Sequence, residues 1–418
     1  MPIVHADPPT RAAAALSDRA EAEAYVASVC FKHGPPQQLG AELEWVVQHS
    51  GNPHLPLHPR HLADALGPHA PTSLVPDSPQ QTLPRGSIVT VEPGGQLEIS
   101  SPPRATLTEL VTTVDGDTAA LVDLLRPAGL LLTGRASDPH RSPVRILDVP
   151  RYAAMEATFD RVGPMGRVMM CSTAAVQVCL DAGTAVDAPD RWAALHELGP
   201  VLLGAFANSP ELVGGPTGWA SSRMRAWFAL DPVRTHPCPV NGEPALDWAR
   251  RALDTPLLCR RSPGDGWDGP RSVTFADWLA GVLPGRPDTA DLDYHLTTLF
   301  PPVRPRGYLE VRYLDAQPPG EWLVPVAVVA ALLHDPATTS AARAACAPAA
   351  GRWSLAARRG LADPVLAAAA ADVFDLACRH LGDVGASPAV RALVEEITER
   401  RVRYGRCPAD ERTPGGRS

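Results

Sequence analysis

Lysine is almost absent from this chain of 418 residues, and Lys32 is its single example. A Schiff base with lysine is therefore excluded at every other position, and arginine has to bind any anionic ligand. The sequence also contains no Gly-x-x-x-x-Gly-Lys-[Ser/Thr] loop and no Gly-x-Gly-x-x-Gly turn after a predicted strand. A nucleotide would therefore bind by neither the P-loop route nor the dinucleotide-fold route.

Long apolar runs and paired cysteines are missing as well. No stretch of about 18 apolar residues occurs, and the segment 1–7 lacks the charged-then-apolar pattern of a secretory signal. The eight cysteines include no Cys-x-x-Cys pair, so we expect them to be reduced and mostly buried. The net charge is -8 and the basic residues are scattered, which is not the charge pattern of a nucleic-acid-binding surface. We therefore expect a cytoplasmic protein that binds neither membrane nor nucleic acid.

Proline and glycine are abundant, at 46 and 33 residues, yet together they stay below the roughly 25–30% that indicates low-complexity disorder. We find no internal repeat and no linker. Predicted strands and helices interleave over the first three quarters, which favours an α+β fold with helices packed on one side of a mainly antiparallel sheet. We expect one catalytic domain at 1–407, with a core of about 40–335, a helical C-terminal part of about 336–403 and a disordered tail at 408–418.

Periodicity and turn signals place the individual elements. A Thr106-Leu107-Thr108-Glu109 capping box begins one helix. The predicted helices are 17–29, 60–66, 107–114, 191–206 and most of 325–402. The predicted strands are 42–47, 87–92, 96–100, 130–133, 173–181 and 308–313, with a loop at 165–170.

Glutamates recur on the polar faces of these strands, where they alternate with apolar residues. A period of two sends such carboxylates to one face, and the tight turn Pro93-Gly94-Gly95 folds one segment into a hairpin. Carboxylates gathered on one sheet face need cations, and Mg²⁺ suits them because it also bridges to substrate phosphates. The alternative is that each pair of glutamates faces solvent. The five residues are Glu42, Glu44, Glu92, Glu98 and Glu310.

Several short motifs follow one another in a recognisable order. The most specific is Val91-Glu92-Pro93-Gly94-Gly95-Gln96-Leu97-Glu98-Ile99-Ser100. The others are at 40–44, 151–152, 169–178, 206–210, 222–227, 295–301 and 308–312. In order and spacing, from about residue 40 to 335, the chain resembles the plant-type glutamate–cysteine ligase family of the glutamine synthetase-like superfamily.

The resemblance implies a glutamine synthetase-like sheet with an acidic concave face, and a ligase that uses ATP and Mg²⁺. In that family the side-chain carboxylate of L-glutamate attacks the terminal phosphate of ATP, and the amine of L-cysteine displaces the resulting acyl phosphate. The alanine-, arginine- and proline-rich composition suggests a high-GC actinobacterial source, where relatives of this kind supply ergothioneine biosynthesis. The oligomeric state is not predicted.

Site residues are carried over from the same resemblance. The five glutamates would hold magnesium ions, and Glu98 and Arg312 would be catalytic, with Arg312 stabilising the transferring phosphoryl group. Arg223 would bind the glutamate α-carboxylate, unless it is a surface arginine or exchanges roles with Arg225. The remaining assignments are Thr173, Gln177 and Trp227 in the substrate pocket, and Gln96 and Arg312 at the nucleotide.

Two departures from the family keep other functions open. Cys179 stands where the family often has Asn, and we interpret it as a packing residue. The helical region after about residue 335 carries no recognised motif. The alternatives are a γ-glutamyl ligase for another amine and, from a different class, a non-catalytic nucleotide or amino-acid sensor.

Overall fold

The computed structural model describes residues 13–240, 242–261, 267 and 269–412. Its centre is a six-stranded sheet in which every neighbouring pair is antiparallel. The strand order is β3 (Ile88–Val91), β4 (Leu97–Ser100), β1 (Leu39–Trp45), β6 (Ala175–Leu180), β10 (Leu309–Asp315) and β9 (Val303–Pro305). The predicted α+β class with a mainly antiparallel sheet is confirmed.

Two small sheets lie outside the central one. The first pairs β2 (Val47–His49) with β5 (Leu130–Leu132), and the second pairs β7 (Glu211–Leu212) with β8 (Gly215–Pro216). The strand predicted at 130–133 therefore exists as β5. It pairs with β2, which follows β1 in the chain, and it does not join the central sheet.

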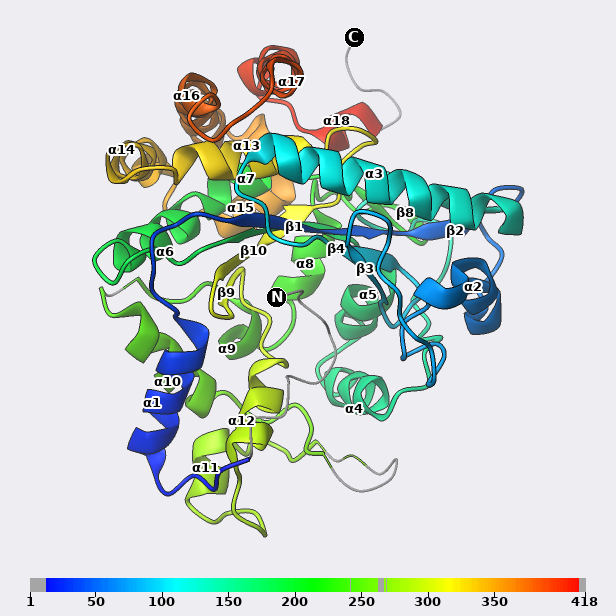
Figure 1. Ribbon diagram of the computed structural model, residues 1–418, viewed down its shortest axis with the longest axis vertical. Helices are drawn as coiled ribbons and strands as arrows, with labels where there is room; N and C mark the ends of the chain where they lie inside the picture. The colour runs from blue at the N-terminus through cyan, green and yellow to red at the C-terminus, as the bar shows by residue number, and fades with distance from the viewer. Residues whose placement is uncertain (1–12, 241, 262–266, 268, 413–418) are drawn as a thin grey trace.

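Helices cover the apolar face of the sheet (Figure 1). On this face Leu43, Val178 and Val311 are at most 1% exposed, and α13 packs directly on β6. Every residue of α13 is buried. The helices of this layer are α3 (Leu107–Leu125), α6 (Ala188–Glu197), α7 (Gly199–Phe206), α13 (Leu323–Leu332), α14 (Pro336–Cys346), α15 (Trp353–Arg359), α16 (Pro364–His380) and α17 (Pro388–Arg400), with α18 (Pro408–Arg412) beside them.

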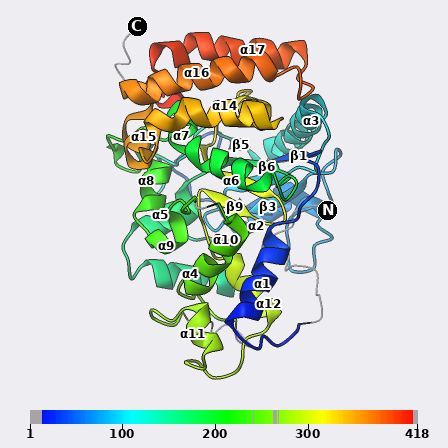
Figure 2. The same cartoon turned by 90° about the vertical axis from the view of Figure 1, so that its left-hand side faces the viewer.

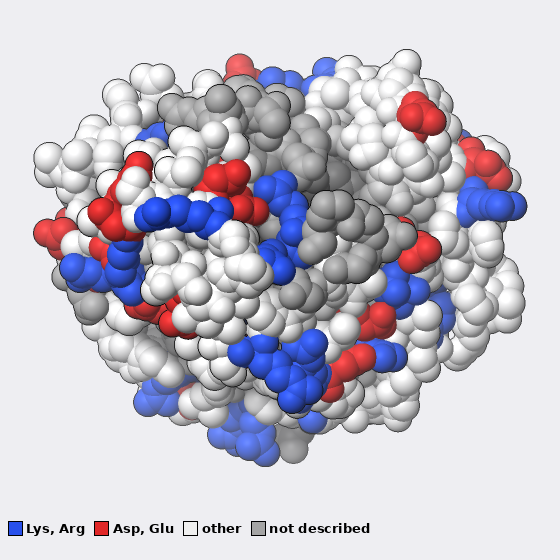
Figure 3. All heavy atoms as spheres, turned by 90° about the horizontal axis from the view of Figure 1, so that it is seen from below, with Lys and Arg blue, Asp and Glu red and all other residues white. Residues whose placement is uncertain are grey.

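The remaining helices lie toward the opposite, polar face or around its edges, as the turned view shows (Figure 2). They are α1 (Arg19–Cys30), α2 (Pro59–Leu66), α4 (Pro150–Phe159), α5 (Met165–Ser172), α8 (Ser222–Phe228), α9 (Pro232–Thr235), α10 (Pro244–Asp254), α11 (Phe275–Leu279) and α12 (Thr289–Leu296). The space-filling view from below shows basic and acidic side chains interspersed on that surface (Figure 3).

Local sequence explains the elements that were predicted well. Asp18 caps α1 by accepting from the backbone N–H of Glu21, and Thr106 and Glu109 form the predicted capping box of α3. The hairpin turn closes with Gly95 N–H donating to the carbonyl of Glu92 at 2.8 Å. Gly95 has φ of 90°, a conformation that favours glycine.

Two predictions about elements are wrong, and one alternative for Arg223 falls away. The segment at 165–170, predicted as a loop, belongs to helix α5. Gly166 lets this helix pack closely on Phe159, because a Cβ at Gly166 would lie 2.2 Å from the Phe159 Cβ. The helix predicted at 191–206 is interrupted at Leu198 and continues as α7, whose first turn contains Pro200. The exchange of Arg223 with Arg225 would require a strand at 222–227 whose register shifts by one residue, but this segment is helical, so the exchange does not arise.

The predicted disordered tail is also wrong in its first part. Residues 408–412 form α18, in which Pro408 and Ala409 are buried. Arg412 donates to the side-chain oxygen of Asn208 at 2.7 Å, and Arg401 donates to Glu411 at 2.6 Å. The rest of the predicted tail, 413–418, lies outside the described residues.

Among the described residues, none of the helices taken singly has both the length and the apolar character that a membrane span requires. The segments Leu323–Leu332 and Pro336–Ala349 are long and apolar enough only when taken together, and they meet at a bend of 110°.

Candidate active site

A cavity of about 80 Å³ opens on the polar face of the central sheet. Its wall combines residues of β1, β4, β6, β9, β10 and the turn between β3 and β4 with residues of α4, α5 and α8. All predicted site residues line it except Glu42 and Glu310, which are buried. Those that line it are Glu44, Glu92, Gln96, Glu98, Thr173, Gln177, Arg223, Trp227 and Arg312.

One side of the cavity is acidic. Glu44 on β1 stands opposite Glu98 on β4 in the sheet register, and Glu92 follows β3 at the hairpin turn. The Oγ1 of Thr90 donates to Glu98 at 2.6 Å, and the backbone N–H of Ala175 donates to Glu44 at 2.9 Å. These bonds orient the two carboxylates, and both donors are neutral groups.

The pKa values express this crowding of charge. Burial and the neighbouring Glu44 raise the pKa of Glu92 to about 7. Burial, followed by Glu42, Glu44 and Glu92, raises the pKa of Glu98 well above its ordinary value. A divalent cation in contact with these oxygens would remove the repulsion, and oxygen-only donors are those that Mg²⁺ prefers. The residues present therefore fit a magnesium site.

Glu42 and Glu310 form a deeper group with Cys179, and ligand atoms of the three lie within 4.8 Å of one another. Burial and then Glu310 raise the pKa of Glu42 to about 7. Burial alone would raise the pKa of Glu310, but Arg304 and Arg312 outweigh it and lower that pKa below its ordinary range. Glu310 therefore carries its charge as a partner of arginines.

Cys179 is buried beside Glu42 and Glu310. It faces Glu310 across the β6–β10 pair and Gly40 across the β1–β6 pair. Burial, followed by Glu42 and Glu310, raises the pKa of its thiol well above the ordinary value. The thiol does not line the cavity, which agrees with the packing interpretation.

The other side of the cavity is basic. An Arg312 Nη donates to Gln177 Oε1 at 2.5 Å and to Glu310 at 3.0 Å. The Arg223 guanidinium lies 5.0 Å from the ring centre of Trp227, one helical turn further along α8. Burial lowers the pKa of Arg223, whose nearest carboxylate, Asp315, is 3.8 Å away. Both guanidinium groups are therefore held near the cavity with room for an anionic partner.

Gln177 connects the two sides. Its amide nitrogen donates to Glu44 at 2.8 Å and to Glu98 at 3.4 Å, while its oxygen accepts from Arg312. Gln177 therefore fixes the distance between the acidic wall and the basic wall.

Three of the residues that line the cavity have a buried polar atom without a hydrogen-bond partner. Among the described residues, Gln96 Oε1, Trp227 Nε1 and Arg312 Nε are buried and make no hydrogen bond. All three residues line the same cavity. A buried polar atom without a partner costs about 1–3 kcal/mol, so a bound polar ligand that satisfies these atoms would be stabilised.

Several lining residues were not predicted. Arg304 on β9 forms a bidentate pair with Glu310, at 2.6 and 3.2 Å. Its signal was weak, since it lies in a short strand between Val303 and Pro305. Arg151, Tyr152, Thr297 and Phe300 also line the cavity. They lie in motifs that carried the family resemblance, which gave no role to them.

Comparisons with known proteins agree with this geometry. The sequence model of the glutamate–cysteine ligase family 2 (GCS2) matches residues 38–413, a range that includes the C-terminal helices. The glutamate–cysteine ligase EgtA of Mycobacterium tuberculosis is 39% identical over 409 residues, 95% of this chain and 90% of its own length. EgtA of Mycolicibacterium smegmatis is 41% identical over 402 residues, 94% of this chain and 90% of its own.

More distant relatives match less of their own length or share the fold alone. The chloroplastic glutamate–cysteine ligase of Medicago truncatula is 32% identical over 241 residues, 55% of this chain and 47% of its own. A crystal structure of a Francisella tularensis glutamate–cysteine ligase in complex with AMP superposes with a TM-score of 0.55 at 13% identity, covering 91% of this chain and 84% of that one. By its match over most of its length, this chain belongs to glutamate–cysteine ligase family 2.

Proposed function

We propose that this chain joins the γ-carboxylate of L-glutamate to the amine of L-cysteine at the expense of ATP, giving γ-glutamylcysteine, ADP and phosphate. The observation that carries the proposal is a single cavity in which buried carboxylates face buried arginines across Gln177. A ligase that binds amino-acid carboxylates together with a metal–nucleotide complex needs both kinds of wall. The relatives at 39–41% identity bear the name of this activity.

Glu44, Glu92 and Glu98 would hold Mg²⁺ at the cavity surface, with Glu42 and Glu310 behind them. When bound, the ion supplies positive charge for the phosphates and orients the oxygens that attack and leave. The protein's own contribution is to gather these carboxylates on adjacent strands, where Thr90 and Ala175 fix two of them.

Arg312 would neutralise the transferring phosphoryl group. In the first step an oxygen of the glutamate γ-carboxylate bonds to the terminal phosphorus of ATP, and the bond from that phosphorus to the bridging oxygen of ADP breaks. In the second step the cysteine nitrogen bonds to the acyl carbon, phosphate leaves and the nitrogen loses a proton. Negative charge builds on phosphate oxygens in both steps, and a preorganised guanidinium stabilises it. The free Nε of Arg312 is available for that contact.

Arg223 would bind the α-carboxylate of glutamate. Its guanidinium is 2% exposed, lies over Trp227 and has no closer carboxylate than Asp315. A planar fork pairs well with a carboxylate. Thr173 and Gln177 would shape the pocket, and Gln96, whose amide donates to the carbonyl of Thr173 at 2.9 Å, would lie beside the nucleotide.

The test is release of phosphate from ATP by the purified chain. We expect turnover when Mg²⁺, L-glutamate and L-cysteine are all present, and a product with the mass of γ-glutamylcysteine. Omission of any one of them should remove the signal. Turnover that never depends on the thiol amino acid would contradict the proposal.

The acceptor and the pathway are proposed separately. A panel of amines in the same assay should show preference for cysteine, and preference for another amine would favour the alternative ligase. ATP binding without turnover under all conditions would favour the sensor.

We further propose that the product enters ergothioneine biosynthesis in the cytoplasm. Loss of ergothioneine on deletion of the gene is the expected result.

A further inference from the structure

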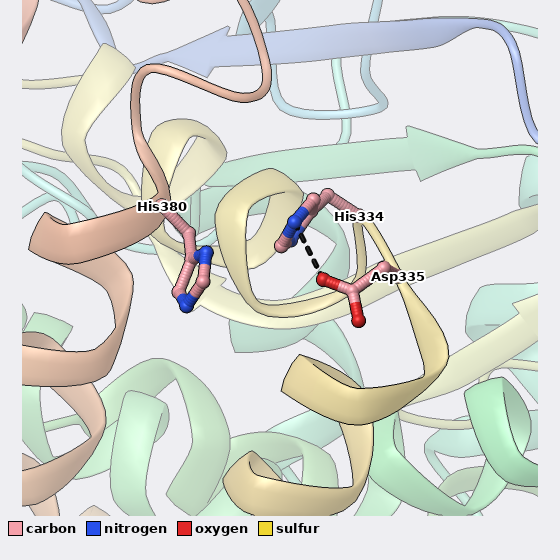
Figure 4. Close-up of side chains that lie close together, drawn as sticks. All are labelled: His334, Asp335 and His380. Atoms are coloured by element: carbon pink, nitrogen blue, oxygen red, sulfur yellow. Dashed lines mark ion pairs between the residues drawn. The ribbon is translucent and has the colours of Figure 1, made fainter.

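Two histidines and two aspartates meet where α13, α14 and α16 come together, in the helical layer that covers the apolar face of the sheet. His334 and Asp335 join α13 to α14, while His380 ends α16 and Asp383 lies in the turn after it. Figure 4 shows His334, Asp335 and His380 approaching one another from these segments. None of the four lines the acidic cavity.

The nitrogen and oxygen atoms of this cluster are close. One ligand atom from each of His334, Asp335 and His380 lies within 4.8 Å of the other two. His334 Nε2 is 2.5 Å from Asp335 Oδ2 and 3.5 Å from Asp383 Oδ2. His380 Nδ1 is 2.9 Å from the same Asp383 oxygen. Each imidazole therefore has a nitrogen facing a carboxylate.

Neighbouring groups hold the first two side chains in place. His334 Nδ1 lies 2.9 Å from the carbonyl oxygen of Ala331, and since a carbonyl can only accept, Nδ1 carries a hydrogen. Nε2 is then the nitrogen that faces Asp335, and a proton or a metal ion has to lie between them. Thr338 donates to Asp335 Oδ2 at 2.7 Å, which orients the carboxylate. A histidine whose other N–H is bound to a carbonyl is the usual arrangement of a metal-binding histidine.

The geometry points to a transition-metal site formed by His334, Asp335 and His380, with Asp383 as the fourth ligand and Zn²⁺ as the expected ion. Mixed imidazole and carboxylate ligands suit Zn²⁺, whereas Mg²⁺ takes oxygen ligands almost alone. The four side chains are between 17% and 55% exposed, so the ion can reach them from solvent. Tetrahedral bonds of about 2.0–2.1 Å place ligands about 3.3 Å apart, so His334 and Asp335 separate on binding.

A bound ion would join the end of α13 to the end of α16. These two helices already pack on each other, and α13 also packs on β6, the strand that carries Gln177. Without an ion, the same side chains form hydrogen bonds that hold the helix ends together. A metal site would bind Zn²⁺ tightly, whereas a cluster that serves only to form hydrogen bonds would not. A measurement of Zn²⁺ binding therefore decides between the two.

The experiment titrates the full-length protein with ZnCl₂ by calorimetry, in a buffer with excess Mg²⁺ to occupy the acidic cavity. Co²⁺ is titrated in parallel, because visible absorption bands report the geometry of its ligands. The variants are His334→Gln and His380→Gln. The matched control is His54→Gln, since His54 and His140 form another surface pair with ring centres 5.0 Å apart. Circular dichroism checks that each variant is folded.

We expect one Zn²⁺ per chain, a rise in melting temperature with Zn²⁺, and Co²⁺ bands typical of four-coordination. Each cluster variant should bind at least tenfold more weakly, and His54→Gln should bind like the unmodified chain. Absence of saturable binding in Mg²⁺ would overturn the proposal. Equal binding by the folded cluster variants would overturn it too, and either variant suffices if the other does not fold.

Discussion

Glu98 illustrates, at the scale of one residue, how function and stability oppose each other in the cavity. It is fully buried, and three other glutamates together with burial raise its pKa. Such an arrangement costs free energy in the absence of a cation, because like charges in a low dielectric repel. Natural proteins tolerate such a cost where a ligand needs it.

Replacing Glu98 by glutamine tests this opposition. The amide keeps the shape and can still accept from Thr90, which donates to Glu98 at 2.6 Å, but it removes one negative charge. We expect turnover to fall at least 100-fold while the melting temperature stays equal or rises. Phosphate release and a thermal melt in the absence of Mg²⁺ measure the two effects. The exposed Glu395→Gln should change neither, and near-normal turnover in Glu98→Gln would refute the metal assignment.

Arg304 shows the opposite situation, a buried charge that is paired. Its guanidinium donates twice to Glu310, and both side chains are at most 4% exposed. Removing one partner of a buried pair leaves an uncompensated charge and typically costs about 3–5 kcal/mol. Arg304→Gln should therefore lower the free energy of unfolding by about that amount in a urea titration.

The double variant Arg304→Gln, Glu310→Gln is the control for that prediction. It removes both charges, although Arg312 then loses its contact with Glu310, which is 3.0 Å long. We expect it to recover part of the lost stability. A double variant as unstable as the sum of the two single variants would show that the ion pair itself contributes little.

At the scale of elements, the hairpin turn is held against α5 by one glycine. A Cβ at Gly94 would lie 2.2 Å from the carbonyl oxygen of Cys171, a backbone atom that cannot turn away. Gly94→Ala should therefore displace α5 from the hairpin and destabilise the fold by about 1–3 kcal/mol. Urea titration measures it, and Gly51→Ala, with no atom within 4 Å of its Cβ, should be near neutral. Equal stability of both variants would mean that α5 can move freely.

The hairpin also shows what the sequence can predict. Its alternation, its turn residues and its recognisable motif all lie within ten residues, so local rules suffice. The place of Arg304 opposite Glu310 depends on which strands pair, and β9 is too short to have a periodicity of its own. Helix α5 packs closely on Phe159 through Gly166, a residue type that is more typical of loops than of helices. Helix α18 is tied to Asn208, about 200 residues away in sequence, and its own sequence is polar like that of a disordered tail.

At the scale of the whole molecule, buried histidines and buried glutamates make the free energy of unfolding depend on pH in opposite directions. Burial lowers the pKa of His196 to about 4 and of His295 to about 3, from an ordinary 6.5. The unfolded chain therefore binds these protons first, and the stability from neutral burial is complete above pH 6.5 and falls as pH decreases below it. Glu42 and Glu92, with pKa values raised to about 7, contribute stability at low pH that is lost as pH rises toward 7.

The two dependences can be separated by replacing the histidines. His295 Nε2 lies 2.8 Å from the carbonyl of Ala252, and glutamine can keep that hydrogen bond without a proton to gain. One pH unit below 6.5, each buried neutral histidine costs the fold about 1.4 kcal/mol. We therefore expect the unmodified chain to lose about that much more unfolding free energy than His295→Gln between pH 7.5 and 5.5. The exposed His33→Gln should follow the unmodified chain, and parallel curves for all three would show that His295 takes up its proton without loss of structure.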